Sequence, residues 1–564
     1  MTLMSEVELK LASTLNEMPH LKQSLLEMAS DGRATCRKSF DTYYDTADDK
    51  LRREGLVLLI SERDHDYIQK VSAKQVSGMT PPMAGHWEDV IEGDRPNPRA
   101  PNSGAHLPMG LDHAELHARF TTRVRRTLFT LKPDASTQIE GALDEGEIRT
   151  ADGKSVEPVS EVELLLKDGN PAALYGTALR LLEIAPLRIE IRSKAERGYH
   201  LLDGGTDARQ TQAYLPSNLK PDLTVEESLQ RIGRNCLSTV LLCEAAATAD
   251  IPDGVHQMRV AIRRLRSVVA TMRRMLPSEQ YQWVTQTLKW MAGVLGPARN
   301  WDVFSSSLLA SVRGVLLRGQ ELDEFCRVCE HARRSAHESA NAAIRSSQYT
   351  AALLKLSQWF ASRSWRNQPV SEQSALLMAP IETVASTLIG RRYKKVKKSA
   401  DSFAQLTLER RHEFRIAVKK LRYTTEVFKD LFDNQGVAEF VQLLKPLQDD
   451  LGYINDVRVA NELLTDLQIS NAAIARAAGI VLGWHDRGLA DTDRKLRKHV
   501  RRFREARPFG DQSGQSVGTT CRVRLGQCRI APDGGRCADI ADRQTVRFPE
   551  LADDARPALR LPRG

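Results

Sequence analysis

The sequence predicts an α+β protein of more than one domain, with a β-rich N-terminal region and an all-helical C-terminal region. Up to about residue 205, charged and apolar residues alternate with the two-residue period of β-strands. From about residue 222 to residue 507, apolar residues recur at spacings of three and four, which is typical of amphipathic helices. A basic helical segment occurs twice in this second region, which predicts a duplicated unit.

The composition is that of an ordinary globular protein, with 564 residues of which 41% are hydrophobic and 27% charged. The net charge of +9 favours phosphate-rich partners, although the clustering of the charges matters more than their total. The sequence has eight cysteines, no signal peptide after Met1 and no apolar run of about 18 residues. We therefore expect a cytoplasmic protein with reduced thiols and without a membrane partner.

One pair of cysteines has the spacing of a metal site. Cys326 and Cys329 are separated by two residues, and His331 follows. No second pair accompanies them, so we favour packed helix cysteines over a zinc site.

The first predicted strand, Glu6-Val-Glu8-Leu-Lys10-Leu, places two carboxylates and an ammonium on one face. Later segments alternate in the same way: 139–144 with Glu140 and Asp144, 160–165 with Glu161 and Glu163, and 188–194. Charged faces on several strands favour a tunnel with a polar interior over independently solvated strands. In such a tunnel the carboxylates can hold a hard divalent cation, and the lysine can face phosphate oxygens.

Helices are expected to cover part of the outside of this sheet, over about residues 19–28 and over 171–184. Pro19 suits the first turn of the earlier helix. Segment 77–102 is rich in Pro, Gly and Met, and we interpret it as a long connection between two strands.

Five motifs follow one another along the first 200 residues. They are Glu6-x-Glu8-x-Lys10, Tyr43-Tyr-Asp-Thr46, Leu51-Arg52-Arg-Glu-Gly55, Ser160-Glu-Val-Glu163 and Ser193-Lys-Ala-Glu-Arg-Gly-Tyr199. In these motifs the region resembles the CYTH family, also called triphosphate tunnel metalloenzymes, over nearly all of residues 4 to 202. The resemblance implies an antiparallel eight-stranded β tunnel that binds triphosphate-containing compounds with Mg²⁺ or Mn²⁺ and hydrolyses or cyclises them.

The same resemblance assigns site residues by position. It implies metal-facing carboxylates at Glu6, Glu8, Asp144, Glu161 and Glu163. It implies phosphate-facing cations at Lys10, Arg52, Arg125 and Lys194, which complete a catalytic set with Glu6 and Glu8. The cations would spread the charge of the transferring phosphoryl group, and no covalent nucleophile is needed.

The region also departs from the family pattern at three phosphate-binding cations. Leu59 and Ser61 stand where two arginines are usual, and Ser72 stands where a lysine is usual. The loss of such preorganised cations costs about 2 to 4 kcal/mol each in comparable sites. Lys70, Lys74 or Arg63 would compensate if the strand register shifted by one residue.

The duplicated basic segment carries a histidine followed by cations at matching positions. The copies are His256-Gln-Met-Arg259-Val-Ala-Ile-Arg263-Arg-Leu-Arg266 and His412-Glu-Phe-Arg415-Ile-Ala-Val-Lys419-Lys-Leu-Arg422. Positions +3, +7 and +10 stack with the histidine on one helix face. Two facing stripes of this kind favour a polyanion as ligand, because arginine and lysine both contact phosphate oxygens.

About forty residues after each histidine comes a Leu-Gly pair, in Leu295-Gly-Pro-Ala-Arg-Asn-Trp-Asp302 and in Leu451-Gly-Tyr-Ile-Asn-Asp456. With these motifs the region resembles the CHAD family, with the departure that Asn300 replaces a usual Asp. The resemblance implies a helical bundle with internal pseudo-symmetry that binds inorganic polyphosphate. The expected binding residues are His256, Arg259, Arg263, Arg266, His412, Arg415, Lys419 and Arg422.

The histidines admit a structural interpretation, in which they bond the facing Asn-Asp segment. Metal binding ranks lower, because no carboxylate or cysteine lies at ligand spacing. Basic runs at 391–398 and 494–504 are typical of solvated helix faces, and beside the two basic helices they would instead lengthen the polyanion surface.

We therefore expect a CYTH domain over 1–205, a linker over 206–221, a CHAD domain over 222–507 and a disordered tail over 508–564. The expected function is metal-dependent hydrolysis of inorganic triphosphate, combined with polyphosphate binding. The alternative is a scaffold with a degenerate tunnel that binds polyphosphate or storage granules. Nucleic-acid binding ranks last, because aromatic residues make up 6% of the chain and do not interleave the basic helices.

Overall fold

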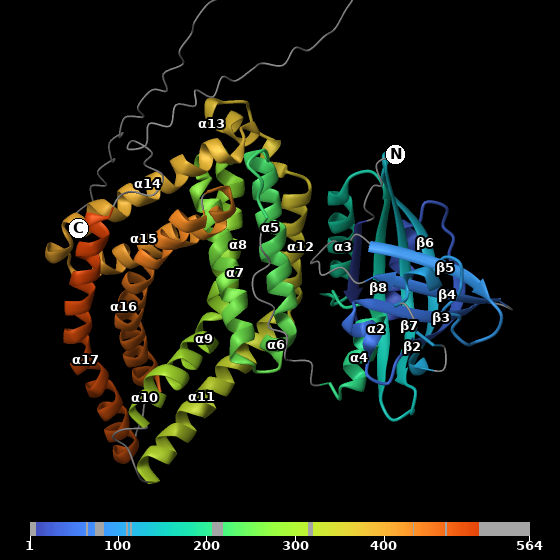
Figure 1. Ribbon diagram of the computed structural model, residues 1–564, viewed down its shortest axis with the longest axis horizontal. Helices are drawn as coiled ribbons and strands as arrows, with labels where there is room; N and C mark the ends of the chain where they lie inside the picture. Colours follow the sequence, from blue (N-terminus) through green and yellow to red (C-terminus); the bar gives the residue numbers. More distant parts are fainter. Residues whose placement is uncertain are drawn as a thin grey trace, which may run out of the picture. The chain divides into compact units, whose positions relative to one another are not determined.

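A computed structural model of the chain describes residues 7–63, 66–73, 84–108, 111–112, 115–205, 218–313, 320–432, 434–467 and 471–506. An antiparallel sheet occupies the N-terminal part of these residues and helices occupy the C-terminal part, so the predicted fold class is confirmed (Figure 1). Glu6, Lys74, most of the expected linker and the expected disordered tail lie outside the described residues.

The sheet contains nine strands in the order β5-β4-β3-β2-β6-β7-β8-β1-β9. They are β1 (Val7–Ala12), β2 (Thr35–Asp45), β3 (Leu56–Arg63), β4 (Asp66–Ala73), β5 (Ala84–Ile91), β6 (His117–Asp134), β7 (Thr137–Thr150), β8 (Val156–Asp168) and β9 (Arg188–Ile189). Eight strands are implied by the resemblance, and the ninth is the two-residue β9, which pairs with β1. The sheet ends at β5 and β9 and does not close.

The two faces of the sheet differ because successive residues of a strand point to opposite faces. On β1, Leu9 and Leu11 are buried in a hydrophobic core. Helices α1 (Met18–Met28) and α3 (Pro171–Ile184) pack on this apolar face. Burial of each leucine side chain stabilises the folded state by about 1.5 to 3 kcal/mol relative to an exposed side chain. Both helices lie where the sequence predicts them, and each has a proline in its first turn.

Two predictions for the N-terminal region were wrong in part. Segment 77–102 contains β5, which pairs with β4 and is not merely a connection. Segment 188–194 is a strand only at β9, and Lys194 begins helix α4 (Lys194–Leu202). A capping box explains this change, because the Ser193 side chain accepts the Glu196 backbone N–H while the Glu196 carboxylate accepts the Ser193 N–H. The other short elements are η1 (Leu15–Glu17), α2 (Lys50–Arg53) and η2 (Gly104–His106).

Every regular element described between residues 225 and 505 is helical, as predicted. The longer helices are α5 (Val225–Leu242), α7 (Pro252–Thr271), α8 (Ser278–Val294), α9 (Gly296–Val303), α11 (Gln320–Ile344), α12 (Ser347–Ala361), α14 (Ile381–Asp401), α15 (Leu408–Val427), α16 (Asn434–Asp466) and α17 (Ala472–Glu505). The shorter ones are α6 (Glu244–Thr248), η4 (Arg273–Met275), η5 (Phe304–Leu309), α10 (Ala310–Arg313), η6 (Ser364–Arg366), α13 (Glu372–Ala375), η7 (Leu376–Met378), η8 (Phe403–Gln405) and η9 (Lys429–Leu431).

The duplication extends beyond the basic helices. Helix α7 begins at Pro252 and α15 at Leu408, a separation of 408 − 252 = 156 residues, and α5 and α14 begin 381 − 225 = 156 residues apart. The halves meet in reciprocal backbone bonds, from the Val225 N–H to the Ala379 carbonyl and from the Ile381 N–H to the Leu223 carbonyl. These residues are also separated by 156 positions, so the bonds obey a pseudo-two-fold relation.

The halves differ at the Leu-Gly motif. In the first half the helix is interrupted at Leu295, between α8 and α9, and Pro297 lies in the first turn of α9. Proline lacks the N–H that would continue the helix. In the second half Tyr453 occupies the equivalent position, and α16 runs through it. The Asn-Asp residues after each motif are therefore helical and do not form a loop.

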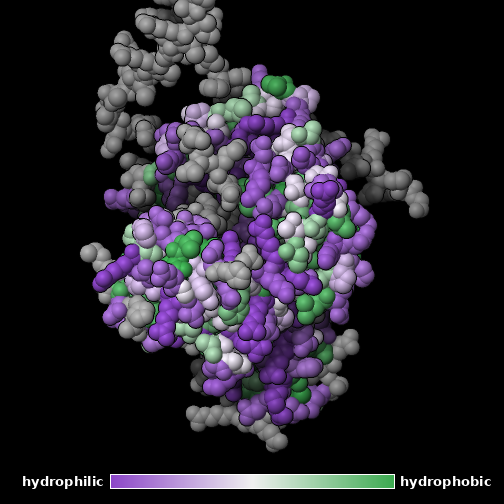
Figure 2. Space-filling view, turned by 90° about the vertical axis from the view of Figure 1, so that its right-hand side faces the viewer, coloured by the Kyte–Doolittle hydropathy of each residue, from purple (hydrophilic) through white to green (hydrophobic). Residues whose placement is uncertain are grey.

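Hydrophilic side chains dominate the face of the molecule shown in Figure 2. None of the described helices combines the length and the apolar character that crossing a membrane requires. Cys326 and Cys329 lie on α11, where Cys329 is buried and Cys326 half-buried.

Candidate functional site

Three carboxylates form a compact acidic cluster on the polar face of the sheet. Asp144 on β7 is the cross-strand neighbour of Glu161 on β8, and Glu163 lies two residues further on the same face. One oxygen of each carboxylate lies within 4.8 Å of the others. The side chain of Asp144 is fully buried, that of Glu161 is 2% exposed and that of Glu163 is 12% exposed.

The ammonium of Lys194 lies among these three carboxylates. Its Nζ donates to Asp144 at 2.7 Å, to Glu161 at 2.5 Å and to Glu163 at 2.9 Å. Burial alone would lower the pKa of Lys194, but the three carboxylates raise it well above its usual value. The lysine is therefore a permanent cation at this position.

Two further cations adjoin the cluster. Arg126 makes a bidentate contact with Asp144, with bonds of 2.8 and 2.6 Å, and also bonds Glu163. The Lys10 ammonium lies 3.5 Å from Glu8 and 4.0 Å from Glu163. Burial opposes ionisation of Glu163, yet Lys194, Lys10 and Arg126 hold its pKa well below the usual range.

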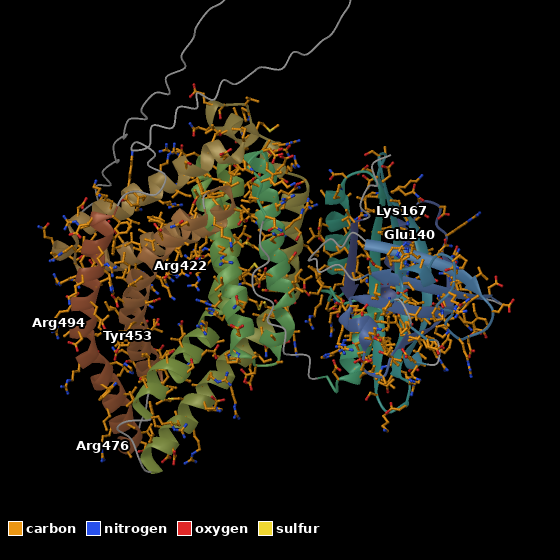
Figure 3. All side chains as sticks on the ribbon, in the orientation of Figure 1. Glu140, Lys167, Arg422, Tyr453, Arg476 and Arg494 are labelled. Atoms are coloured by element: carbon orange, nitrogen blue, oxygen red, sulfur yellow. The ribbon has the colours of Figure 1, made fainter. Side chains whose placement is uncertain are left out.

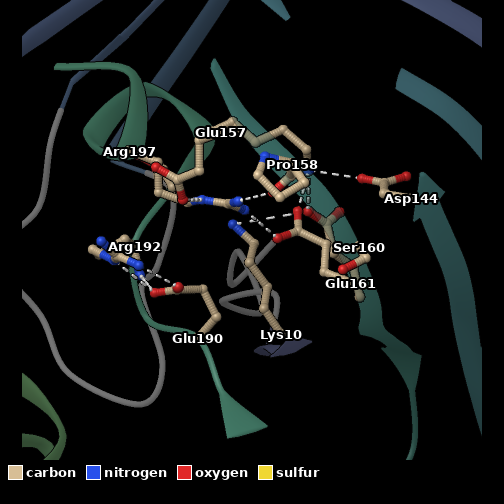
Figure 4. Close-up of polar contacts among 12 residues, drawn as sticks. Lys10, Asp144, Glu157, Pro158, Ser160, Glu161, Glu190, Arg192 and Arg197 are labelled. Carbon is tan, nitrogen blue, oxygen red and sulfur yellow. Dashed lines mark hydrogen bonds and ion pairs between the residues drawn. The ribbon is translucent and has the colours of Figure 1, made fainter. Parts of the chain in front are cut away.

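Arg197 on α4 fixes the outer oxygen of Glu161. Its guanidinium donates to Glu161 at 2.9 Å, to Glu157 at 2.7 Å and to the Pro158 carbonyl at 2.7 Å (Figure 4). The side chain of Arg197 is 7% exposed, so this anchor is buried. Glu161 is thus oriented from one side by Arg197 and from the other by Lys194.

The donor set fits a divalent metal that prefers hard oxygen ligands. Asp144, Glu161 and Glu163 supply carboxylate oxygens at the close spacing that Mg²⁺ or Mn²⁺ needs. The Lys194 ammonium already bonds all three carboxylates. A metal can therefore use these oxygens only if the ammonium moves away from them.

The structure brings together five of the site residues expected from the sequence: Lys10, Asp144, Glu161, Glu163 and Lys194. Glu8 joins this group through Lys10.

Arg52 and Arg125 pair with carboxylates outside the acidic cluster. Arg52 pairs with Asp203 at 2.7 Å and lies over the ring of Tyr199. Arg125 pairs with Glu145, next along each strand to Arg126 and Asp144, and both residues border the same cavity as Arg126 and Asp144.

Arg126 is the cation that the sequence argument missed. Two adjacent arginines on one strand point to opposite faces, and the sequence alone does not fix which one faces inward. The register does, because Arg126 is the cross-strand neighbour of Asp144.

A cavity of about 1560 Å³ adjoins the acidic cluster. Asp144, Arg126 and Lys194 line it, and so do Leu59 and Ser61, two residues that replace the usual arginines. Lys70 also lines the cavity and is the cross-strand neighbour of Leu59. It therefore faces the tunnel without a shift in register, and it pairs with Glu88 at 2.9 Å.

Arg37 and Arg63 also border the cavity. Arg37 on β2 is the cross-strand neighbour of Arg126, and Arg63 ends β3. Arg37, Arg63 and Lys70 thus line the same cavity as Leu59 and Ser61, the two residues that replace the usual arginines.

In the helical region the two basic stripes meet, because α7 contacts α15. We define the central cation cluster as His256, Arg259, Arg263, Arg299, Arg415 and Lys419, whose charges act on one another. Burial, with repulsion from Arg415 and Arg263, lowers the pKa of Lys419 to about 7. Burial also lowers the pKa of Arg259 to about 10.

Asp456 is the carboxylate whose charge acts on Arg299, Arg415 and Lys419 of this cluster. Within the described helices, Arg263, Arg415 and Lys419 form no ion pair, and the Nε atoms of Arg263 and Arg415 are buried without an acceptor. Unpaired cations at such density indicate an anionic ligand.

The remaining residues predicted from the stripes have different surroundings. Arg266 lies beside Arg263, and burial lowers its pKa. Arg422, which is labelled in Figure 3, bonds Glu426 at 2.7 Å and Gln448 at 3.0 Å. Burial lowers the pKa of both His256 and His412, so both imidazoles lose their proton more readily than usual.

Two neighbours of the cluster were not predicted as site residues. Arg299 and Asp456 follow the two Leu-Gly motifs, and burial raises the pKa of Asp456. Their positions within the motifs could have suggested them. Asn300 is the equivalent of Asp456, since 456 − 300 = 156, so a carboxylate is present in one half and replaced by an amide in the other.

Comparison with known proteins agrees with this division. The CYTH domain model matches residues 4–199, and the CHAD domain model matches residues 231–465. An inorganic triphosphatase of Haemophilus influenzae is 31% identical over 163 residues, which are 28% of this chain and 45% of that protein. An uncharacterized protein of Mycobacterium tuberculosis is 27% identical over 326 residues, which are 57% of this chain and 58% of that protein.

The solved CHAD domain of the plant Ricinus communis is 27% identical, with a TM-score of 0.43, and the match covers 52% of this chain and 95% of that one. The chain thus spans little more than half the length of the mycobacterial relative. The order of the matched segments agrees with the sheet and the helices described above. The protein is a two-domain chain in which a CYTH domain is followed by a CHAD domain.

Proposed function

We propose that the CYTH domain hydrolyses inorganic triphosphate with Mg²⁺ or Mn²⁺ and that the CHAD domain binds inorganic polyphosphate. One observation carries the first part: three carboxylates and three cations form one cluster, and Asp144, Arg126 and Lys194 of this cluster line a large cavity. The relationship to an inorganic triphosphatase supports the reaction class.

Each group in the tunnel has a distinct task in this proposal. Asp144, Glu161 and Glu163 would hold the metal, which when bound supplies Lewis-acid polarisation of phosphoryl oxygens and orients a water. Arg126 and Lys10 would contact the phosphates and stabilise the charge that develops on transfer. Lys70 would extend this cationic wall beside Leu59.

The unpaired cations of the central cation cluster support the second part. A polyphosphate chain would supply the oxygens that Arg263, Arg415 and Lys419 lack. Several weak contacts along one polymer add through effective concentration. Association with polyphosphate granules would follow from the same affinity.

The proposal is tested by phosphate release from inorganic triphosphate with Mg²⁺ or Mn²⁺. Asp144→Asn should lower the rate on the order of 10²-fold, because it removes one of the three carboxylates. Its matched control is Asp152→Asn, which changes an exposed aspartate that pairs with Lys154 and does not line the cavity, and it should retain the rate. A metal-independent rate, or equal loss in both variants, would contradict the proposal.

A specific observation favours a second candidate function. Leu59 and Ser61 line the cavity in place of two arginines, and in this second function the tunnel binds a phosphate chain without hydrolysing it. This scaffold predicts no phosphate release above background from the wild-type protein, together with retained polyphosphate binding by the CHAD domain. The same assay with a polyphosphate-binding measurement therefore separates the two functions.

A further inference from the structure

We propose that Lys194 is an internal counter-cation that occupies the metal position, so that a divalent metal and a phosphate chain bind the tunnel interdependently. The inference rests on the proposed function of the same site.

The geometry is the first argument. A lysine ammonium has three N–H donors, and here each is directed to a different carboxylate, at 2.7, 2.5 and 2.9 Å. These carboxylates are the only group of three potential ligands found within the described residues. The ammonium therefore uses the oxygens that a metal would need.

Electrostatics excludes simultaneous occupancy. An ammonium and a divalent cation that share the same three oxygens would lie within a few ångströms of one another, where like charges repel strongly in a buried site. With the Lys194 side chain 14% exposed, solvent alone compensates poorly for the lost bonds. Metal binding without another anion is therefore opposed.

Lys194 is also more easily displaced than the two arginines of the cluster. Arg126 is held by a bidentate contact with Asp144, and Arg197 by three buried bonds that include a backbone carbonyl. Lys194 has a flexible four-carbon side chain on the first residue of α4, and its three bonds all end on the carboxylates in question. When a metal enters, the Lys194 ammonium is free to turn towards the cavity, which Lys194 already lines.

A phosphate chain in that cavity would give the displaced ammonium new acceptors. The chain should therefore raise the affinity for the metal, and the metal should raise the affinity for the chain by the same factor. Metal without phosphate should bind weakly. Lys194 would thus link loading of the metal to arrival of the substrate.

The test measures Mn²⁺ binding by the electron paramagnetic resonance signal of free Mn²⁺, with and without methylenediphosphonate as a non-hydrolysable phosphate chain. For the wild type we expect weak binding that the diphosphonate strengthens on the order of ten-fold. Lys194→Met should bind Mn²⁺ alone on the order of ten-fold more tightly, and the diphosphonate should then add little. Lys154→Met, in an exposed turn pair with Asp152, is the control and should match the wild type.

Removal of Lys194 leaves three carboxylates without their main partner and could prevent folding. In that event the comparison is made between Glu163→Gln and Glu163→Gln/Lys194→Met, because the double variant removes one charge of each sign. The double variant should again bind Mn²⁺ more tightly than the single one.

Unchanged Mn²⁺ affinity on removal of the lysine, or wild-type affinity that the diphosphonate leaves unaltered, would overturn the inference. Metal-dependent phosphate release would still support the proposed function in that case. Absence of both Mn²⁺ binding and phosphate release would instead reject the proposed function, and the inference with it.

Discussion

Lys70 shows how a single residue can preserve charge in a tunnel that has lost cations. It lies on β4 directly beside Leu59 on β3, so a positive charge remains next to the place of a missing arginine. Glu88 on β5 holds it at 2.9 Å. From the sequence, three cations of the family pattern are replaced by Leu59, Ser61 and Ser72. The strand register shows that Lys70 supplies a positive charge on β4, the strand adjacent to Leu59.

We expect Lys70→Met to lower kcat/KM for inorganic triphosphate on the order of ten-fold. The loss should be smaller than for an unpaired phosphate ligand, because Glu88 already neutralises part of the charge. Steady-state kinetics with Mg²⁺ checks this, with Lys154→Met as control. An unchanged kcat/KM would mean that the substrate does not reach this part of the cavity.

Lys419 is the residue expected to set the pH dependence of polyphosphate binding. Burial and repulsion from Arg415 and Arg263 lower its pKa to about 7, so the unliganded protein holds a partly deprotonated lysine at neutral pH. A bound polyanion favours the protonated form and raises this pKa. Binding therefore takes up protons, and affinity falls as the pH rises through 7.

We expect polyphosphate affinity to decrease between about pH 6.5 and pH 8.5, and Lys419→Arg to remove most of this dependence while retaining affinity. Arginine stays protonated over this range. His256 and His412 have lowered pKa values, so they should act below this window. Titration calorimetry in buffers of different ionisation enthalpy measures the protons taken up, and equal uptake by Lys419→Arg would refute the assignment.

At the scale of elements, the duplicated helices are equivalent in position but not in surroundings. Arg259 on α7 donates to the Ala292 carbonyl near the end of α8, at 2.5 Å. Its equivalent Arg415 on α15 makes no such bond within the described residues, since α16 continues where α8 ends. The break before Pro297 thus gives one arginine a structural task that its counterpart lacks.

This difference predicts unequal effects of two equivalent substitutions. Arg259→Ala should weaken polyphosphate binding and also lower the free energy of unfolding by about 1 to 3 kcal/mol, because it leaves a helix carbonyl without its donor. Arg415→Ala should weaken binding with little effect on stability. Thermal denaturation and a binding titration of both variants test this, and unchanged binding in the double variant would contradict the role assigned to the cluster.

At the scale of the molecule, the two candidate anion sites are clusters of cations, one beside the acidic cluster of the sheet and one where α7 contacts α15. The net charge of +9 is modest for 564 residues, so clustering and burial of the cations set the affinity. Flexible phosphate polymers fit such confined clusters, whereas duplex DNA presents a stiff and regular backbone.

We therefore expect DNA at equal phosphate concentration to leave most polyphosphate bound to the protein. A competition titration with labelled polyphosphate at fixed salt measures this directly. Displacement on equal terms would favour a general nucleic-acid-binding surface instead.

Local sequence patterns predicted the β-rich region, the helical region, the helical repeat and most residue types of both candidate sites. Periodicity and motif spacing are local properties, and they predicted helices at 19–28 and 171–184 and the acidic pairs on β7 and β8. They did not predict β5, nor the end of β9 before Lys194, because a short strand depends on its neighbours more than on its own pattern.

Only the tertiary structure decided which side chains meet. Strand register placed Arg126 rather than Arg125 beside Asp144, and Lys70 beside Leu59. Packing of α7 against α15 merged two stripes into one cluster, and the start of α4 brought Lys194 to carboxylates more than thirty residues away in sequence. The physical reason is the same in each case: side-chain direction changes with every residue along a strand, and ion pairs depend on distances in space that no local pattern encodes.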